Sequence, residues 1–217
     1  MQTQIIHRSL LQRLVYGCSR QLIRTVGWVL FRLRLSGVDR FPESGAALVC
    51  SNHQSGLDAI LLGGFCDRQL NFLAREGLFR WWPFAALIRF YNATPVRRVG
   101  MGISGLKEAL RRLTLGELVV IFPEGRRSRD GEIGPLKSGF CVLARKSGVP
   151  LVPVAIAGAY DVWPTGKRFP RLARICLVAG DPIPAKLVAE IDDEQLVDLV
   201  DTRIRECFAE ATRLRAR

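Results

Sequence analysis

The sequence predicts a single α/β domain with a mixed, largely parallel sheet flanked by helices, preceded by an N-terminal amphipathic helical segment. Short apolar runs alternate with helix-like patterns along its 217 residues, and this alternation is typical of βαβ units. The runs at 46–51, 118–122 and 151–157 are almost continuously apolar, as in strands that are buried on both faces. The length suits one sizeable core, and no linker divides the chain.

Residues 8–27 predict an amphipathic helix, because apolar residues recur there at every fourth position while arginines occupy other parts of the helical wheel. The recurring residues are Leu10, Leu14, Cys18, Leu22 and Val26. Two interpretations stay open and can coexist: the helix packs on the core, or it lies on an anionic membrane surface. We therefore divide the chain into a membrane-associating segment, 1–28, and a main domain, 29–217.

The start of the chain is not expected to be a signal peptide or to cross a bilayer. Arginines interrupt every apolar run near the start, which is not typical of a signal peptide. The longest early run, 26–31, is far shorter than the ~20 residues of a spanning helix.

The main domain is expected to alternate strands and helices after an opening strand. Helices are predicted where apolar residues recur three and four apart, and strands where short apolar runs end at Gly or Pro turns. The predicted strands are 29–35, 46–51, 70–73, 93–96, 118–122, 151–157 and 172–179. The predicted helices are 57–65, 83–90, 102–115, 139–147 and 193–214.

The composition indicates an anionic partner. The formal net charge is +12 and the isoelectric point is about 10.2, with arginine supplying most of the cations. Such a surface fits nucleic acid, a membrane or a phosphorylated ligand, and composition does not choose among them.

The six cysteines are scattered without a CxxC pair, so we expect reduced, buried thiols in a cytosolic compartment rather than disulfides or zinc.

Residues 51–58, SNHQSGLD, carry His53 and Asp58 directly after a predicted buried strand. On one continuous helix the two side chains would point roughly 140° apart. They can meet if His53 precedes the helix and Asp58 lies in its first turn, with Ser55 as N-cap. The carboxylate would then hold one imidazole nitrogen and leave the other to take a proton. Alternatively, Asp58 only completes a capping box with Ser55.

A second polar patch, FPEGRRS at 122–128, follows another predicted buried strand. Because ligands of open α/β sheets bind beyond the carboxyl ends of the strands, we expect the two patches to form one site. Gly125 with Arg126 and Arg127 could close on a phosphate, although a solvated basic loop is the competing interpretation. Glu124 would then need an arginine partner or a substrate hydroxyl.

Other chemistry has weaker support. Arg97 and Arg98 follow a predicted strand, but from the residues alone a solvated pair of cations is the favoured interpretation. The chain has no GxSxG, no GxxxxGK[ST] and no cluster of metal ligands, so a serine nucleophile, nucleotide hydrolysis and metal catalysis are not expected. A His/Asp pair without a nucleophile suits activation of a substrate hydroxyl.

These blocks resemble the 1-acylglycerol-3-phosphate acyltransferase family, the PlsC-type glycerolipid acyltransferases. Asn52, His53 and Asp58 match the family's NHxxxxD motif. Residues 122–128 match FPEGTRS with Arg126 in place of threonine. The remaining blocks are Pro95-Val96-Arg97-Arg98, where Arg97 replaces the acid of Pro-Val-Asp-Arg, a Lys-x-Gly stretch that begins at Lys137, and the apolar strand Leu151-Val152-Pro153-Val154. The blocks follow the family order over about residues 30–180.

The resemblance implies an acyltransferase domain over 29–217 that transfers an acyl group to a lysophospholipid hydroxyl. The acceptor would be 1-acyl-glycerol-3-phosphate and the product phosphatidic acid, with acyl-CoA or acyl-acyl-carrier-protein as co-substrate and no further cofactor or metal. His53 would be the general base and Asp58 its orienting partner. The residues implied in acceptor or phosphate binding are Arg98, Glu124, Gly125, Arg126, Arg127 and Lys137.

The resemblance also implies a peripheral enzyme at the cytoplasmic face of a membrane, the inner membrane in a bacterium, and no nucleic-acid partner. The additional arginines leave another acceptor open, such as a lyso-ornithine lipid. Two other classes also stay open: a thioesterase-type hydrolase that uses water in place of the acceptor, and a non-enzymatic basic protein that binds membrane or nucleic acid.

Overall fold

The computed structural model describes residues 10–80, 82–91, 93–96 and 102–217. In this part of the chain, seven strands form one sheet in the order β1-β7-β6-β2-β5-β3-β4. The strands are β1 (Arg34–Ser36), β2 (Ala47–Ser51), β3 (Leu70–Arg75), β4 (Ala93–Val96), β5 (Leu118–Ile121), β6 (Leu151–Ala157) and β7 (Cys176–Ala179). All neighbours are parallel except β6 and β7, so the predicted mixed, largely parallel sheet is confirmed.

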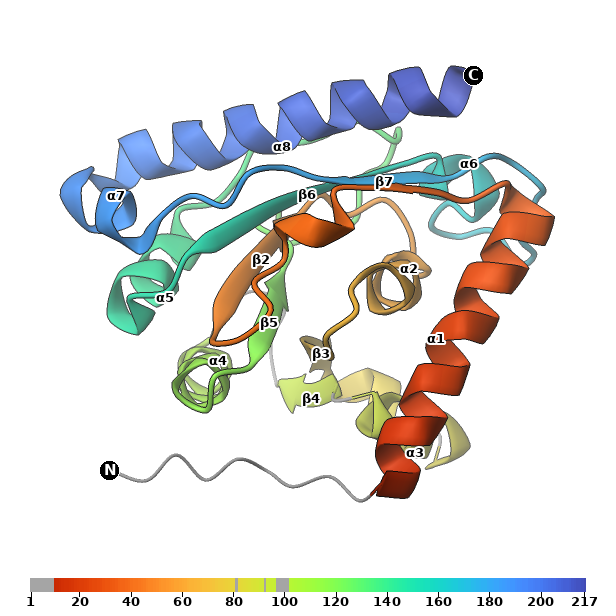
Figure 1. The fold of residues 1–217 in the computed structure, drawn as a ribbon, viewed down its shortest axis with the longest axis horizontal. Helices are drawn as coiled ribbons and strands as arrows, with labels where there is room; N and C mark the ends of the chain where they lie inside the picture. The colour runs from red at the N-terminus through yellow and green to blue at the C-terminus, as the bar shows by residue number, and fades with distance from the viewer. Residues whose placement is uncertain (1–9, 81, 92, 97–101) are drawn as a thin grey trace.

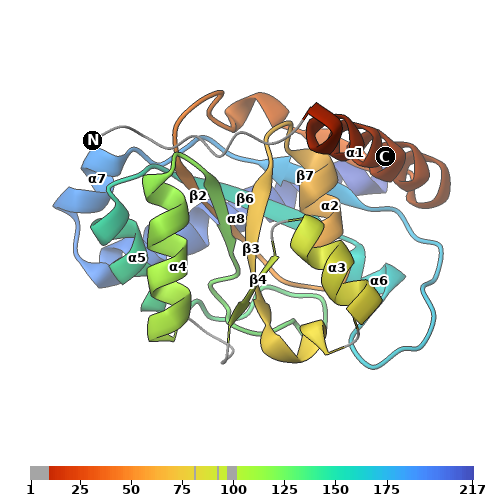
Figure 2. The ribbon, with the colours of Figure 1, turned by 90° about the horizontal axis from the view of Figure 1, so that it is seen from below.

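Helices cover both faces of the sheet (Figures 1 and 2). They are α1 (Leu10–Phe31), α2 (Asp58–Phe65), α3 (Trp82–Phe90), α4 (Ile103–Thr114), α5 (Gly139–Ser147), α6 (Ala159–Val162), α7 (Ala185–Glu190) and α8 (Asp193–Ala216), with 3-10 turns at Val38–Arg40 and Glu76–Phe79. Side chains of α4, α5, α7 and α8 join the core on one face, and those of α2 and α6 join the core on the other.

The central strands are apolar throughout because each contributes to both cores. In β2, Leu48 and Cys50 face the core under α8, whereas Ala47 and Val49 face the core under α2. All four are fully buried. Strand side chains alternate between the two faces of a sheet, so a strand covered by helices on both faces needs apolar residues at every position.

The opening strand predicted at 29–35 is wrong in its first half. α1 continues through Phe31, Arg32 then takes a left-handed φ of 45°, and the Leu33 amide donates to the Gly27 carbonyl. Strand β1 therefore begins only at Arg34. A short apolar run such as this one does not distinguish a helix from a strand by its periodicity. The strand predicted at 172–179 likewise begins later, at Cys176, and α6 and α7 were not predicted.

Helix α1 packs on α2 through Ile23 and Arg24 rather than through the predicted apolar stripe. Arg24 donates to the carbonyls of Gly64 and Phe65, at 2.7 and 2.9 Å, and pairs with Asp67 at 3.0 Å. These carbonyls belong to the last turn of α2, where backbone oxygens lack helical partners. Ile23 packs so closely on Gly64 that a Cβ at Gly64 would lie 2.5 Å from it. The helix thus packs on the domain through arginine hydrogen bonds together with Ile23, which the periodicity did not indicate.

The apolar stripe of α1 faces outward. Leu14, Leu22 and Trp28 are 65%, 63% and 70% exposed, and Val26 and Val29 are also exposed. Among the helices in the described part of the chain, none combines the length and the apolar character needed to cross a membrane.

Candidate active site

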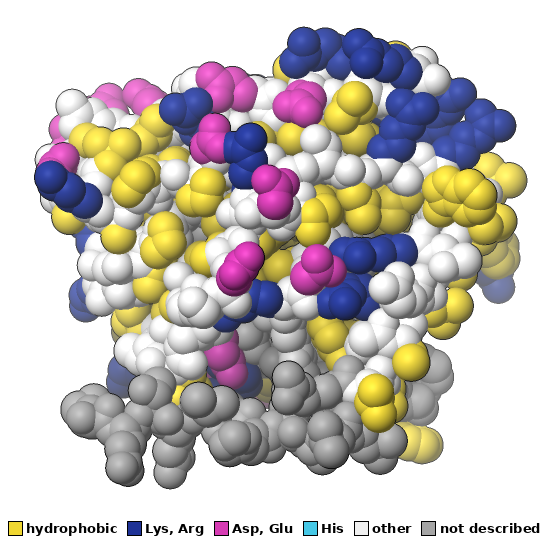
Figure 3. Space-filling model, in the orientation of Figure 1, with side chains coloured by type: hydrophobic (Ala, Val, Ile, Leu, Met, Phe, Trp, Pro, Cys, Tyr) yellow, Lys and Arg dark blue, Asp and Glu magenta, His cyan; other side chains and the backbone are white. Residues whose placement is uncertain are grey.

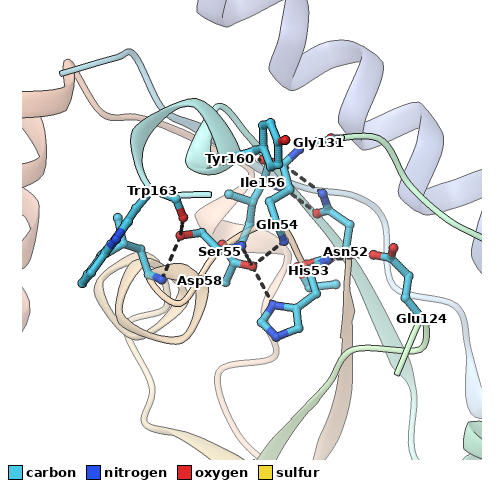
Figure 4. Close-up of polar contacts among 12 residues, drawn as sticks. Asn52, His53, Gln54, Ser55, Asp58, Glu124, Gly131, Ile156, Tyr160 and Trp163 are labelled. Carbon is cyan, nitrogen blue, oxygen red and sulfur yellow. Dashed lines mark hydrogen bonds and ion pairs between the residues drawn. The ribbon is translucent and has the colours of Figure 1, made fainter. Parts of the chain in front are cut away.

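His53 and Asp58 meet at the carboxyl end of β2, as Figure 4 shows. The Nδ1 of His53 lies 2.7 Å from Oδ2 of Asp58. Asp58 is completely buried, whereas the His53 side chain is 23% exposed. An ionised carboxylate only accepts hydrogen bonds, so this contact places the imidazole proton on Nδ1 and leaves Nε2 as the free acceptor.

The geometry requires His53 in a turn and Asp58 in the first turn of α2, as the spacing predicted. The predicted N-cap is wrong, however: Leu57 precedes the helix, and its side chain makes no capping bond. The hydroxyl of Ser55 instead donates to the carbonyl of Trp163 at 2.7 Å and accepts weakly from the Leu57 amide at 3.3 Å. Tertiary contact with the chain after α6 therefore replaces the local cap.

Asp58 also holds the turn that precedes it. Its Oδ2 accepts the backbone amides of Gln54 and Ser55, at 2.6 and 2.9 Å. The bond from Ser55 is one half of a capping box, but the reciprocal half is not formed, because the Asp58 amide donates to the Ser55 carbonyl, at 3.4 Å, rather than to the Ser55 hydroxyl. Asp58 therefore contacts His53 and also makes half of a capping box, so each of the two interpretations drawn from the sequence describes part of its geometry.

The rest of the turn is fixed to β6 and to the loop 122–138. Asn52 exchanges two hydrogen bonds with the backbone of Ile156, at 2.9 and 2.8 Å. Gln54 donates to the carbonyl of Gly131 and accepts weakly from the amide of Tyr160 at 3.4 Å. Asn52 and Gln54 are buried, so these polar side chains satisfy the requirement that buried amides be paired.

The second patch contacts His53 directly. The Glu124 carboxylate accepts the His53 amide at 2.8 Å and the Gly134 amide at 3.0 Å. The Ser128 amide donates to the His53 carbonyl at 2.7 Å. The ring of Phe122 stacks on the imidazole, with centroids 4.0 Å apart and planes 15° apart. The structure thus brings the two sequence patches into one site.

Glu124 has a different environment from the one the sequence suggested. We expected an arginine partner or a substrate hydroxyl, but its two oxygens each accept a backbone amide. Burial raises the pKa of Glu124, while the hydrogen bonds from the His53 and Gly134 amides oppose the rise. The carboxylate therefore joins the two patches through the backbone.

The basic residues of the second patch lie at the rim of this site. Arg127 is exposed, and its Nη1 lies 3.8 Å from the position that a Cβ would take at Gly56. The Lys137 side chain crosses Gly125, whose φ of 70° favours glycine; a Cβ there would lie 3.1 Å from Nζ. Arg126 is also exposed. Arg97 and Arg98 lie outside the described residues.

The thiols have no geometry for nucleophilic chemistry. All six cysteines are unpaired, and all but Cys18 are buried. Burial raises the pKa of Cys66, Cys141, Cys176 and Cys207 to about 11, which keeps these thiols protonated and unreactive. No set of three or more metal-ligating side chains comes together within the described ranges.

The family follows from comparison with known proteins. Residues 32–157, more than half of the chain, match the family model described as Acyltransferase. The chain belongs to the acyltransferase family. A 1-acyl-sn-glycerol-3-phosphate acyltransferase of Bacillus subtilis is 30% identical over 76% of this chain and 81% of its own length. The alpha enzyme of the same name from sheep is 30% identical over 82% of this chain and 63% of its own.

A solved structure agrees with this assignment. The chain shares its fold with the 1-acyl-sn-glycerophosphate acyltransferase PlsC of Thermotoga maritima, with a TM-score of 0.81 and 27% identity over 98% of this chain and 85% of that one. Chloroplastic relatives are longer: the chain spans 41% of the Brassica napus protein, at 32% identity, and 39% of the Arabidopsis thaliana protein, at 31%.

Several residues that position His53 were not predicted from the sequence. Phe122 was read only as part of a motif, and the partners of the turn at Gly131, Tyr160 and Trp163 were not predicted at all. Tyr160 and Trp163 follow the carboxyl end of β6. The rule that sites gather at these ends could have drawn attention to them, although not to the hydrogen bonds they form.

Proposed function

We propose that this chain transfers an acyl group from acyl-CoA or acyl-acyl-carrier-protein to 1-acyl-glycerol-3-phosphate, producing phosphatidic acid. The observation that carries the proposal is the 2.7 Å contact between His53 Nδ1 and the buried Asp58 carboxylate. It leaves a partly exposed Nε2 that can accept the acceptor's hydroxyl proton. Family membership and the names of the relatives from Bacillus subtilis and sheep support the same substrates.

The reaction needs one base and no covalent enzyme intermediate. His53 Nε2 removes the hydroxyl proton as the alcohol oxygen attacks the thioester carbonyl, and Asp58 stabilises the imidazolium that forms. Collapse of the tetrahedral intermediate breaks the carbon–sulfur bond, and the imidazolium returns its proton to the departing thiolate. Positioned proton transfer of this kind contributes about 10²–10⁴-fold to rate.

The acceptor's phosphate is assigned to the basic rim. Arg127 lies beside Gly56 in the His53 turn, and Lys137 lies beside Gly125. Guanidinium and ammonium groups bind phosphate oxygens by charge-assisted hydrogen bonds. Arg126 adds charge, and the family motif assigns Arg98 the role of phosphate clamp. Glu124 contributes by holding the His53 backbone next to this rim.

The outer face of α1 is proposed to place the enzyme on the cytoplasmic face of a membrane as a peripheral protein. Its exposed apolar stripe is suited to the headgroup–acyl boundary of a bilayer. The arginines that fasten α1 to α2 keep that stripe pointing away from the domain. The acceptor lipid would then reach His53 from the same surface.

The decisive experiment incubates the purified protein with labelled acyl-CoA or acyl-acyl-carrier-protein and a panel of acceptors. We expect labelled phosphatidic acid with 1-acyl-glycerol-3-phosphate and no product from the His53→Ala variant. A diacyl product with lyso-ornithine lipid alone would overturn the acceptor assignment. Free fatty acid in every tube would indicate a hydrolase, and no conversion at all would favour a non-enzymatic basic protein.

A further inference from the structure

The chain between α6 and β7, here called the 164–174 loop, presents cations and large apolar side chains together. Phe169 and Leu172 are 71% and 77% exposed. Lys167, Arg168 and Arg171 alternate with them and are exposed as well. The guanidinium of Arg168 lies 5.4 Å from the centre of the Phe169 ring. Large apolar side chains exposed close to several cations are a feature of surfaces that bind a partner or a membrane.

Hydrogen bonds to backbone carbonyls hold the 164–174 loop in place where it leaves α6. The indole of Trp163 donates to the Lys167 carbonyl at 2.8 Å. The Arg171 amide donates to the Val162 carbonyl at 2.7 Å. The loop is therefore tied back to α6 on both sides of Phe169, so the projecting side chains have a defined position on the surface.

The loop runs between the C-terminal end of α1 and the turn that carries His53. At its end, the Ile175 amide donates to the Phe31 carbonyl, the last residue of α1. At its start, Trp163 accepts the hydroxyl of Ser55 from the His53 turn. Figures 1 and 2 both place this stretch on the same flank as α1.

Exposed apolar side chains also occur on α1 near the end of the loop. Trp28, Val29 and Leu30 are exposed in the last turns of α1, next to the point where the loop returns to the sheet. Figure 3 shows hydrophobic side chains gathered at the right-hand edge, with basic side chains above them. Apolar residues rimmed by cations are suited to an anionic bilayer, since both attractions act at the same depth.

We propose that the 164–174 loop is a second membrane contact, in which Phe169 and Leu172 enter the headgroup region while Lys167, Arg168 and Arg171 bind anionic phospholipid. The proposal rests on the proposed function, since it assumes a membrane-borne acceptor. Two contacts, α1 and the loop, fix the orientation of the domain where one helix alone would allow rotation about its axis. The His53 turn, joined to the loop through Ser55 and Trp163, would then face the lipid.

The composition favours a bilayer over other anionic partners. Nucleic-acid surfaces use aromatic side chains on which bases stack, whereas this loop pairs its single aromatic residue with a leucine. Each cation near an anionic leaflet strengthens binding by roughly fivefold. Removing two cations from the loop should weaken binding to anionic vesicles by at least tenfold and leave binding to neutral vesicles nearly unchanged.

The test measures co-sedimentation of the full chain with vesicles of phosphatidylcholine alone and with added phosphatidylglycerol. The loop variants are Arg168→Gln with Arg171→Gln, and Phe169→Ala with Leu172→Ala. Matched controls remove the same kinds of residue from α5 and α7, on the opposite flank: Lys146→Gln with Lys186→Gln, and Val142→Ala with Leu187→Ala. The charge control removes two cations, as the loop charge variant does. A loss of binding in the loop variant alone therefore reflects where the cations lie and not the net charge of the protein.

We expect the charge variant to lose at least tenfold in binding to anionic vesicles only, the apolar variant to lose binding to both vesicle types, and the controls to bind like the parent. Parent-like binding by both loop variants, or an equal loss in the controls, overturns the proposal. Turnover of a short-chain, water-soluble lysophosphatidate should be unchanged in the loop variants. Because sedimentation needs no turnover, a failed acyltransferase assay would leave the membrane result interpretable.

Discussion

One oxygen of Asp58 holds both the imidazole of His53 and the turn that carries it. Oδ2 lies 2.7 Å from His53 Nδ1 and also accepts the amides of Gln54 and Ser55. The other carboxylate oxygen is buried and has no hydrogen-bond partner among the residues that the structure describes. The ring and its backbone are therefore positioned by the same atom, so the imidazole and the turn do not shift independently.

This double role predicts different outcomes for two substitutions of Asp58. Asp58→Ala should lower the free energy of unfolding by about 1–3 kcal/mol, because two amides of buried residues lose their acceptor. Asp58→Asn keeps an acceptor oxygen and should retain most stability, but it removes the charge that stabilises the imidazolium and should lower kcat by about 10²-fold or more. Urea unfolding and steady-state assays measure the two effects. Equal stability loss in both variants would contradict this division.

His53→Ala should lower turnover and leave the stability of the fold nearly unchanged. The imidazole is partly exposed and stacks on Phe122, so its removal leaves the turn held by the backbone bonds to Asp58. Turnover should fall by about 10²–10⁴-fold with the loss of the general base. Circular dichroism and thermal unfolding should remain close to those of the parent. A folded variant with near-normal acyl transfer would exclude His53 as the base.

Much of the fold was predictable because its core strands have a simple physical signature. β2, β5 and β6 are buried on both faces, and each was predicted to within one residue at either end from its apolar run. The juxtaposition of His53 and Glu124 followed from the position of each residue just past such a strand. Local composition and the geometry of parallel sheets were enough for these predictions.

What the sequence did not reveal depends on contacts between distant segments. The cap predicted at Ser55 is replaced by a bond to Trp163, more than a hundred residues away in the chain. The apolar stripe of α1 would ordinarily be assigned to the core side, yet Arg24 turns the other face toward α2. Helical periodicity identifies an apolar face but does not say whether protein or lipid covers it.

Glu124 should act on catalysis through the position of His53. Glu124→Ala removes the acceptor of the His53 and Gly134 amides, which should cost about 1–3 kcal/mol of unfolding free energy. A displaced base should lower kcat, by up to about 10²-fold for a shift near 1 Å, with smaller changes in KM. Glu132→Ala, an exposed carboxylate of the same loop, is the matched control. A large rise in acceptor KM with unchanged kcat and stability would instead assign Glu124 to substrate binding.

Arg127 should contribute to acceptor affinity. Arg127→Ala removes a guanidinium beside Gly56 and should raise KM for the lysophosphatidate more than for the acyl donor, by about tenfold for the loss of one charge-assisted bond. Arg129→Ala, which removes a neighbouring exposed cation, controls for net charge. The family motif predicts the same selective rise for Arg98→Ala. Equal losses toward both substrates would argue against a phosphate-binding role.

The outward face of α1 predicts a membrane affinity that is independent of folding stability. Leu22 and Trp28 are 63% and 70% exposed, so Leu22→Gln with Trp28→Gln should change the free energy of unfolding by no more than about 0.5 kcal/mol per site. Burial of such side chains in a bilayer is worth about 1.5–3 kcal/mol each, so vesicle binding should fall at least tenfold even if insertion is partial.

The control for helix propensity is Gln21→Ala with Thr25→Ala, at two exposed polar positions of the same helix. This control should bind vesicles like the parent.

Arg24→Ala should lower stability and leave vesicle binding intact. It removes the bonds to the last turn of α2 and should destabilise the domain by about 1.5–3 kcal/mol, while the apolar stripe remains intact. If the glutamine variant were destabilised and still bound vesicles, the stripe would be a packing surface of the protein. Because one face of α1 contacts α2 and the other is exposed in this structure, the two sets of variants should not resemble each other in either assay.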